Sequence, residues 1–171
     1  MIIVSPLSAV SRLVTDAGVT HVLGLLGPES AHPDLGLSER NHLRLVFHDI
    51  TGPMDGMLPP MRTHVERIVD FVENWDRTGT LLIHCWAGIS RSTASAFTAM
   101  CLLHPQIDEH EIARELRSHS AVATPNRRII EFADELLGRN GRMLAAVEAI
   151  GPGENAFEGV IFRWNVLRPG P

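Results

Sequence analysis

Apolar residues along the chain gather in short uninterrupted runs and in longer segments with a helical repeat, and the two kinds of segment alternate. The short runs are typical of strands buried on both faces of a sheet. They predict strands over residues 2–4, 20–26, 42–48 and 80–84. The periodic segments predict helices over residues 7–17, 61–75, 93–103, 108–119, 126–137 and 143–150. This order predicts an α/β fold with a central, mostly parallel sheet flanked by helices.

The segment 61–75 carries the clearest helical pattern. Its apolar residues recur at helical spacing, namely Met61, Val65, Ile68, Val69, Val72 and Trp75. Such spacing places them on one face of a helix, and we expect that face to pack against the sheet.

Gly and Pro gather in three segments that cannot continue a regular element. Residues 27–41 and 49–60 are therefore expected to be surface loops. The third segment, 151–153, precedes an apolar stretch over residues 159–164. We expect this tail, within 151–171, to add an edge strand, to cover a groove or to contact a second subunit.

Composition narrows the class of protein further. The chain has 171 residues, of which 44% are hydrophobic and 20% charged, so we expect one soluble globular domain over residues 1–171. The formal net charge of −5, without a basic run, argues against a nucleic-acid partner. No apolar run reaches the length of a membrane span, and the first residues lack the charged lead of a signal peptide. With only two Cys, no disulfide framework is expected, so the predicted compartment is the cytoplasm.

The stretch from His84 to Ser92 joins the apolar run 80–84 to the helical segment 93–103 and carries the strongest chemical signal. A strand, a tight loop and a helix N-terminus together form a cradle for an anion. That setting stabilises the thiolate of Cys85, which is a good nucleophile. Arg91 can hold two oxygens of one phosphate, and a hydroxyl from Ser90 or Ser92 can steady the sulfur. These residue types point to attack of sulfur on a phosphate ester.

The string His-Cys-Trp-Ala-Gly-Ile-Ser-Arg-Ser resembles the Cys-x5-Arg-Ser/Thr loop of the protein tyrosine phosphatase superfamily. From Leu43 to Leu137 the order of elements is similar to the small, dual-specificity-like branch. The resemblance implies a metal-independent phosphatase without a cofactor, acting on a phosphorylated protein or a small phosphoester. It assigns Cys85 as nucleophile, Arg91 as phosphate ligand, Ser92 as the catalytic hydroxyl that aids the sulfur, and His84 as a supporting residue. The implied phosphate-binding positions are Trp86, Ala87, Gly88, Ile89, Ser90 and Arg91.

Such an enzyme needs an acid to protonate the leaving oxygen. Asp49 directly follows the predicted strand 42–48, where the family carries its acid, but it precedes Cys85 by 36 residues, more than is usual for this branch. Asp55 has the commoner spacing of 30 residues and lies in the middle of the loop 49–60. We expect Asp49 to be the acid, with Asp55 as the alternative.

Other functions remain compatible with the same residues. A module that binds a phosphorylated ligand without turnover would use the loop alone, and a sulfur-transfer protein would use Cys85 on a similar loop. Metal catalysis is not expected, because the His residues show no ligand spacing such as His-x3-His. Cys101 is expected to be a buried, unpaired thiol. Because Lys is absent from the loop, a lipid headgroup is a less favoured substrate, and the oligomeric state is left open.

Overall fold

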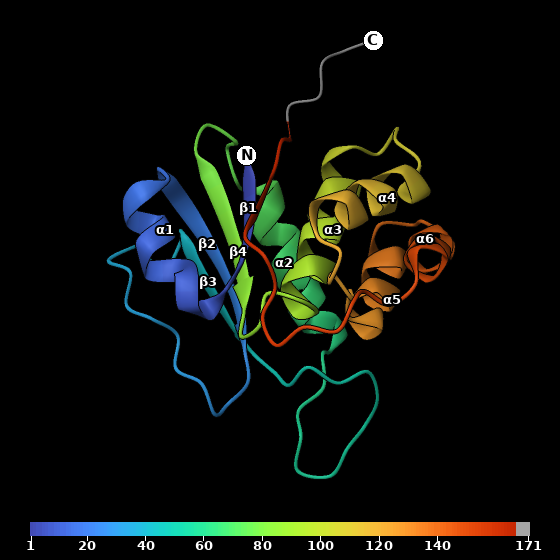
Figure 1. The fold of residues 1–171 in the computed structure, drawn as a ribbon, viewed down its shortest axis with the longest axis horizontal. Helices are drawn as coiled ribbons and strands as arrows, with labels where there is room; N and C mark the ends of the chain where they lie inside the picture. Colours follow the sequence, from blue (N-terminus) through green and yellow to red (C-terminus); the bar gives the residue numbers. More distant parts are fainter. Residues whose placement is uncertain (167–171) are drawn as a thin grey trace.

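The computed structural model describes residues 1–166. A five-stranded sheet with the order β3-β2-β4-β1-β5 forms the centre of the molecule (Figure 1). Strands β1 to β4 run parallel, and β5 pairs with β1 in the antiparallel direction. The strands are β1 Ile2–Pro6, β2 Val19–Leu26, β3 His42–Val46, β4 Thr80–Cys85 and β5 Phe162–Trp164. The expected α/β class with a mostly parallel sheet is confirmed.

Helices cover both faces of this sheet, as parallel strands require (Figure 1). A short 3-10 turn, Leu7–Ala9, leads into α1, which packs on one face over Ile3, Val22 and Leu82. The opposite face carries the larger hydrophobic core, to which the remaining helices contribute. The α-helices are α1 Val10–Asp16, α2 Arg62–Glu73, α3 Arg91–Leu103, α4 Glu109–His119, α5 Arg127–Leu136 and α6 Arg142–Ile150.

The apolar pattern of the sequence explains how α2 is seated. Val65, Ile68 and Val72 are fully buried, and Trp75 follows the helix with only 2% of its surface exposed. Met61, which the pattern placed on the same face, precedes the first helical residue and is 40% exposed. The helix begins one residue later than expected, and Val69, also predicted on this face, is only partly buried.

Other predicted boundaries shift by a few residues, and two of the changes are larger. The expected helix over 7–17 divides into the 3-10 turn and α1. The expected strand over 42–48 ends at Val46, so Asp49 lies three residues beyond β3 instead of directly after it. The loops over 27–41 and 49–60 carry no helix or strand, as predicted.

The apolar tail returns to the sheet edge. Its residues Phe162–Trp164 form β5 beside β1, which confirms the expectation of an edge strand. Before this strand, the N–H of Gly159 donates a hydrogen bond of 2.7 Å to the carbonyl of Ala87. The tail therefore also crosses the loop between Cys85 and Arg91, called the Cys loop below. The part of the expected tail over 167–171 lies outside the described residues. Among residues 1–166, no helix is long and apolar enough to cross a membrane.

Candidate active site

The loop from Trp86 to Ser90 begins where β4 ends and stops where α3 begins. Cys85 is the last residue of β4, which lies between β1 and β2 in the sheet, and it is paired with Pro6 and Leu25. These neighbours leave only 1% of Cys85 exposed. The carboxyl ends of parallel strands and the N-terminus of a helix therefore meet at this residue, as the sequence predicted.

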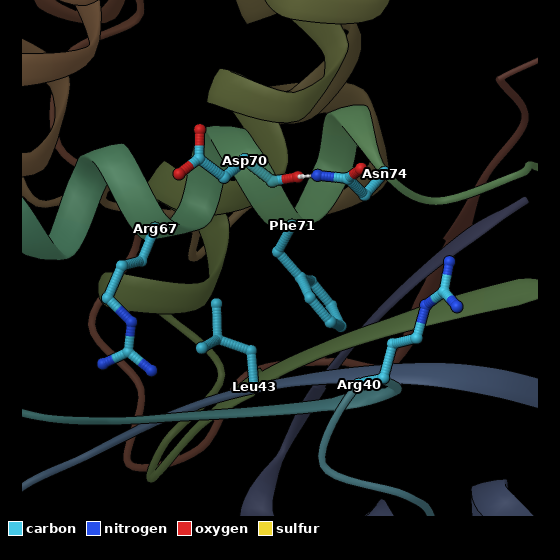
Figure 2. Close-up of a pocket in the computed structure, with 6 residues that line it drawn as sticks. All are labelled: Arg40, Leu43, Arg67, Asp70, Phe71 and Asn74. Atoms are coloured by element: carbon cyan, nitrogen blue, oxygen red, sulfur yellow. Dashed lines mark hydrogen bonds between the residues drawn. The ribbon is translucent and has the colours of Figure 1, made fainter.

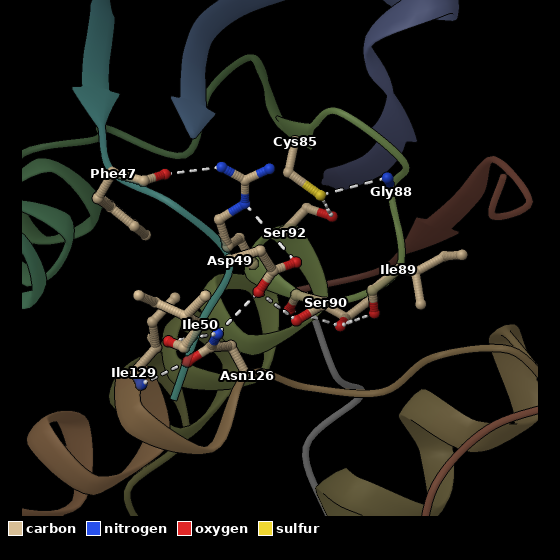
Figure 3. A network of polar contacts seen from close by, with 12 residues as sticks. Phe47, Asp49, Ile50, Cys85, Gly88, Ile89, Ser90, Ser92, Asn126 and Ile129 are labelled. Carbon is tan, nitrogen blue, oxygen red and sulfur yellow. Dashed lines mark hydrogen bonds and ion pairs between the residues drawn. The ribbon is translucent and has the colours of Figure 1, made fainter. Parts of the chain in front are cut away.

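Two polar groups contact the sulfur of Cys85. The hydroxyl of Ser92 lies 3.2 Å from Sγ, and the N–H of Gly88 donates to Sγ over the same distance (Figure 3). Both groups lie on residues that the loop and the first turn of α3 hold in place. They are placed to stabilise negative charge on the sulfur.

The carbonyl groups of the loop are turned away from the sulfur. Those of Trp86, Ala87 and Ile89 accept hydrogen bonds from backbone N–H groups of Leu7, Gly159 and Thr124 at 3.1, 2.7 and 3.0 Å. In a trans peptide the next N–H points opposite to the carbonyl. The N–H groups of the following residues therefore face the interior of the loop, where an anion would sit.

Gly88 is required for this backbone path. Its φ angle is +72°, in the left-handed region that favours glycine. A Cβ at this position would lie 2.6 Å from the backbone nitrogen of Pro6 and 2.8 Å from the carbonyl carbon of Ser5. Strand β1 therefore presses directly on the loop, and no larger residue fits.

Arg91 is the first residue of α3, and its side chain reaches the segment that follows β3. Its guanidinium is buried, and Nη1 donates to the carbonyl of Phe47 at 2.7 Å. Nε lies 3.7 Å from Oδ2 of Asp49, too far for an ordinary hydrogen bond. The planar fork is thus fixed at one end, with Nε left near the acid and the loop.

Asp49 is held by two donors that come from distant parts of the chain. The hydroxyl of Ser90 and the side-chain amide of Asn126 both donate to Oδ1 at 2.7 Å (Figure 3). Asn126 also caps α5, because its Oδ1 accepts from the backbone N–H groups of Arg128 and Ile129. This cap fixes which end of the amide faces Asp49. The structure thus brings Asp49, Arg91 and Cys85 to one place.

Asp55, the alternative acid, lies elsewhere. It is exposed and lies in a turn of the loop over 49–60, which projects from the body of the molecule (Figure 1). Two hydrogen bonds of 2.8 Å join His48 and Leu58 at the base of this loop, one between backbones and one from the Leu58 N–H to Nδ1 of His48. This closure keeps Asp49 beside the loop from Trp86 to Ser90, whereas Asp55 stays exposed in the loop over 49–60.

A cavity of about 520 Å³ opens beside the loop, lined by Glu29, Ser30, His48, Asp49, Met57, Trp86, Ala87 and Arg91. Two of these residues are carboxylates, and Glu29 lies 3.7 Å from Nε2 of His48. Trp86 is 45% exposed and makes an edge contact with Phe157, which is 82% exposed. The rim therefore combines negative charge with aromatic surface.

A second cavity, of about 330 Å³, lies between β3 and α2 (Figure 2). Its lining comprises Arg40, Leu43, Arg67, Asp70, Phe71 and Asn74. None of these side chains is a thiol, so the sulfur chemistry that the sequence predicts belongs to the Cys loop.

His84, the expected supporting residue, faces the other side of the sheet from Cys85. Burial lowers its pKa to about 3, with the nearby rings of His32 and His42 adding to the effect. His84 is therefore neutral at pH 7. The three rings lie close enough to share a metal ion, which His spacing in the sequence did not indicate. The three residues lie on a loop and on two strands, so they follow no fixed spacing along the sequence.

Cys101 agrees with its predicted role as a buried, unpaired thiol. Burial raises its pKa above the ordinary range, with the negative charge of Glu109 adding to the effect. Cys101 is thus kept in the unreactive thiol form.

Comparisons with known proteins address the fold. No protein-family model matches the sequence, and no curated protein matches it. Solved structures do match. The PTP-2 phosphatase of Cydia pomonella has a TM-score of 0.61 at 20% identity, over 78% of this chain and 84% of that one. Human DUSP28 gives 0.58 at 20% identity, over 81% and 94%.

PTPMT1 in complex with PI(5)P is also similar, with a TM-score of 0.56 at 20% identity over 82% of this chain and 94% of that one. At these identities the comparisons establish a shared fold. The chain therefore has the fold of the small, dual-specificity-like phosphatases, and the resemblance seen in the sequence is confirmed at that level.

Proposed function

We propose that this protein is a phosphomonoester hydrolase of the Cys-dependent phosphatase type, which works through a phosphocysteine intermediate and needs no metal ion for catalysis. The observation that carries the proposal is the surrounding of Cys85. Its sulfur has a hydroxyl and a backbone N–H at 3.2 Å, in a loop whose end carries the buried Arg91. The phosphatase fold supports the same reaction class.

In the first half of the reaction, the phosphate of the substrate occupies the loop from Trp86 to Arg91. The sulfur of Cys85 attacks phosphorus opposite the leaving oxygen, so that an S–P bond forms as the P–O bond breaks. Asp49 supplies the proton that the leaving oxygen takes up. Since Oδ1 already accepts two hydrogen bonds, Oδ2 is the oxygen available for this proton.

In the second half, a water molecule attacks the phosphocysteine and Asp49 accepts a proton from it. The S–P bond breaks, and the departing thiolate is stabilised by the hydroxyl of Ser92. In both halves, Arg91 and the inward N–H groups of the loop stabilise the equatorial oxygens of the transferring phosphoryl group. Such fixed electrostatic groups are usually the largest contribution to catalysis.

The rim of the cavity favours one substrate class. Glu29 makes it acidic, and the loop between Cys85 and Arg91 contains no basic side chain. A headgroup with several phosphates would meet repulsion there. Trp86 offers exposed aromatic surface beside the loop. We therefore propose a single phosphate on an aromatic or apolar leaving group, in a protein or a small molecule, over a phosphoinositide such as the one bound to PTPMT1.

Replacement of Cys85 tests the reaction. We expect Cys85→Ser to lower the hydrolysis of a small aryl phosphate by about 10³-fold or more, because a hydroxyl is a far weaker nucleophile at neutral pH. Cys101→Ala is the matched control, and it should retain activity within about twofold because Cys101 is buried away from the loop. Circular dichroism checks that both variants fold.

Other outcomes would identify another function. Equal turnover by Cys85→Ser and the parent protein would exclude the phosphocysteine. A parent protein without turnover that still binds a phosphorylated peptide would be a binding module. A persulfide trapped on Cys85 would instead indicate sulfur transfer.

A further inference from the structure

Three imidazole rings meet on the face of the sheet that is opposite to Cys85. His84 comes from β4, His42 begins β3, and His32 lies on the loop over 27–41. One nitrogen from each ring lies within 4.8 Å of a nitrogen of the other two. No other group of three His, Cys, Asp or Glu ligand atoms that could hold a metal ion occurs within residues 1–166.

Gly24 makes room for this cluster. It lies on β2 between His84 of β4 and Arg44 of β3, and its lack of a side chain leaves space above the sheet. A Cβ on Gly24 would lie 2.7 Å from both Nδ1 of His32 and Nε2 of His84. These two nitrogens therefore converge on the same point.

The rings are buried without the partners that such groups require. His84 is 0% exposed and His42 is 2% exposed. Within the described part of the chain, neither nitrogen of either ring has a hydrogen-bond partner of ordinary geometry, and the same holds for Nδ1 of His32. Buried polar atoms in folded proteins are almost always partnered, so five unpartnered nitrogens in one cluster call for a ligand.

His32 is oriented for such a ligand. Its Nε2 lies 3.2 Å from the carbonyl of Leu45, to which it can only donate, so Nε2 carries the proton and Nδ1 is a free lone pair. Histidines that bind metal ions commonly donate their other ring N–H to a backbone carbonyl in this way. The loop over 27–41 therefore presents a lone pair to the two buried rings.

The protonation state of the rings is compatible with metal binding, which requires neutral imidazole. Burial lowers the pKa of all three, to about 4 for His42 and about 3 for His84. The charge of Arg44 contributes to the shifts of His32 and His42 and would also oppose a cation. Asp34 acts in the other direction on His42.

We propose that His32, His42 and His84 form a binding site for a divalent transition-metal ion of the Zn²⁺ type. Three neutral imidazoles with an open fourth position suit Zn²⁺. The absence of an oxygen ligand among the three side chains makes Mg²⁺ and Ca²⁺ poor occupants. Tetrahedral Zn–N bonds of about 2.0–2.1 Å place ligand nitrogens about 3.3 Å apart, so the side chains of all three rings must shift to bring their nitrogens closer by up to about 1.5 Å.

The site would lie directly behind the Cys loop. His84 and Cys85 are consecutive residues of β4, so an ion on His84 would tie the loop over 27–41 and β3 to the strand that carries the nucleophile. This role is separate from the hydrolysis proposed above, in which no metal ion takes part. Metal binding and hydrolysis can therefore be tested independently.

The experiment uses the full chain carrying Cys85→Ser, so that the thiolate does not bind the metal itself. After removal of metal with EDTA and of EDTA by gel filtration, Zn²⁺ is titrated by calorimetry, and Co²⁺ binding is followed by its visible absorption. We expect one ion per chain. Saturation with Zn²⁺ should raise Tm by roughly 5–10 °C.

Variants identify the ligands. His32→Ala, added to that background, should weaken binding by about 100-fold or more, because it removes a ligand and not merely a ligand's hydrogen-bond partner. His42→Ala should do the same, and circular dichroism checks that each variant folds. His110→Ala, on α4 outside the cluster, is the control and should bind as the parent does. The proposal is wrong if the parent binds neither ion, or if both cluster variants bind as tightly as the control.

Discussion

Two consecutive residues of β4, His84 and Cys85, face opposite sides of the sheet and have opposite polar surroundings. On the side of Cys85, the sulfur, one guanidinium nitrogen of Arg91 and the carboxylate of Asp49 all have partners at 2.7–3.2 Å. On the side of His84, five ring nitrogens have no hydrogen-bond partner of ordinary geometry among the described residues. Cys85 and His84 are both buried, so burial does not explain the difference. The two sets of groups differ in whether the chain itself supplies their hydrogen-bond partners.

The comparison shows how a binding site can be built with or without internal partners. The Cys loop is shaped by the chain's own hydrogen bonds, and an anion would add to a framework already in place. The exception is Nε of Arg91, which is buried and has no hydrogen-bond partner in the described part of the chain. The His cluster consists almost wholly of such groups, so its ligand would complete the framework.

Among substitutions that keep the nucleophile, removal of the guanidinium fork should have the largest effect. We expect Arg91→Lys to lower kcat on an aryl phosphate by about 10²–10³-fold, because an ammonium cannot hold two phosphate oxygens and the carbonyl of Phe47 together. Steady-state kinetics measures the loss. If Arg91→Lys retains more than a tenth of the parent activity, the phosphate does not depend on this fork.

Replacement of the acid should come next. Asp49→Asn should lower kcat by about 10²-fold on a substrate with a poor leaving group, and by much less on a good one, because only the former needs the proton. Asp55→Asn should stay within about twofold of the parent on both, since Asp55 is exposed in the loop over 49–60 and does not line the cavity beside Cys85. A loss confined to Asp55→Asn would reverse the assignment.

Substitutions of Asn126 can separate its contact with Asp49 from its role as the N-cap of α5. Asn126→Ala should destabilise the protein by about 1 kcal/mol through loss of the α5 cap, and should lower kcat about tenfold because Asp49 loses a donor. Asn126→Ser keeps a good cap but is too short to reach Asp49 and cap at once. It should therefore recover stability, measured by urea unfolding, without recovering kcat. Equal recovery of both would show that Asn126 acts on the helix alone.

The sequence was sufficient for the local parts of this picture. The strand, loop and helix around Cys85 follow from an apolar run, a Gly in the middle of the loop and a helical segment, which are contiguous in the chain. Asp49 was favoured because parallel strands deliver their carboxyl ends to one edge of the sheet. Its actual place, three residues beyond β3, depends on the His48–Leu58 closure of the loop, which only the fold reveals.

What sequence reasoning missed is long-range. Asn126 contacts Asp49 across 77 positions, and its cap position alone gave no indication of a second role. The His cluster joins a loop and two strands over a glycine, so no motif with fixed spacing could show it. A partial signal was present, because His42 and His84 each stand beside a buried strand residue at a position where an unpaired polar group is unusual.

The smallest predicted effect is on the free energy of unfolding, and its sign depends on whether Zn²⁺ is bound. In EDTA, His42→Leu should raise the free energy of unfolding by about 1 kcal/mol, because an apolar side chain replaces a buried ring whose two nitrogens have no hydrogen-bond partner among residues 1–166. With Zn²⁺ present at about 100 times its Kd, the parent should instead be the more stable by roughly 2 kcal/mol, since it alone gains the binding energy. Urea unfolding under both conditions measures the difference. A variant that is destabilised in EDTA would show that the ring already has hydrogen-bond partners, such as buried water. The polar groups on both faces of β4 would then be partnered alike, and the contrast drawn above would be wrong.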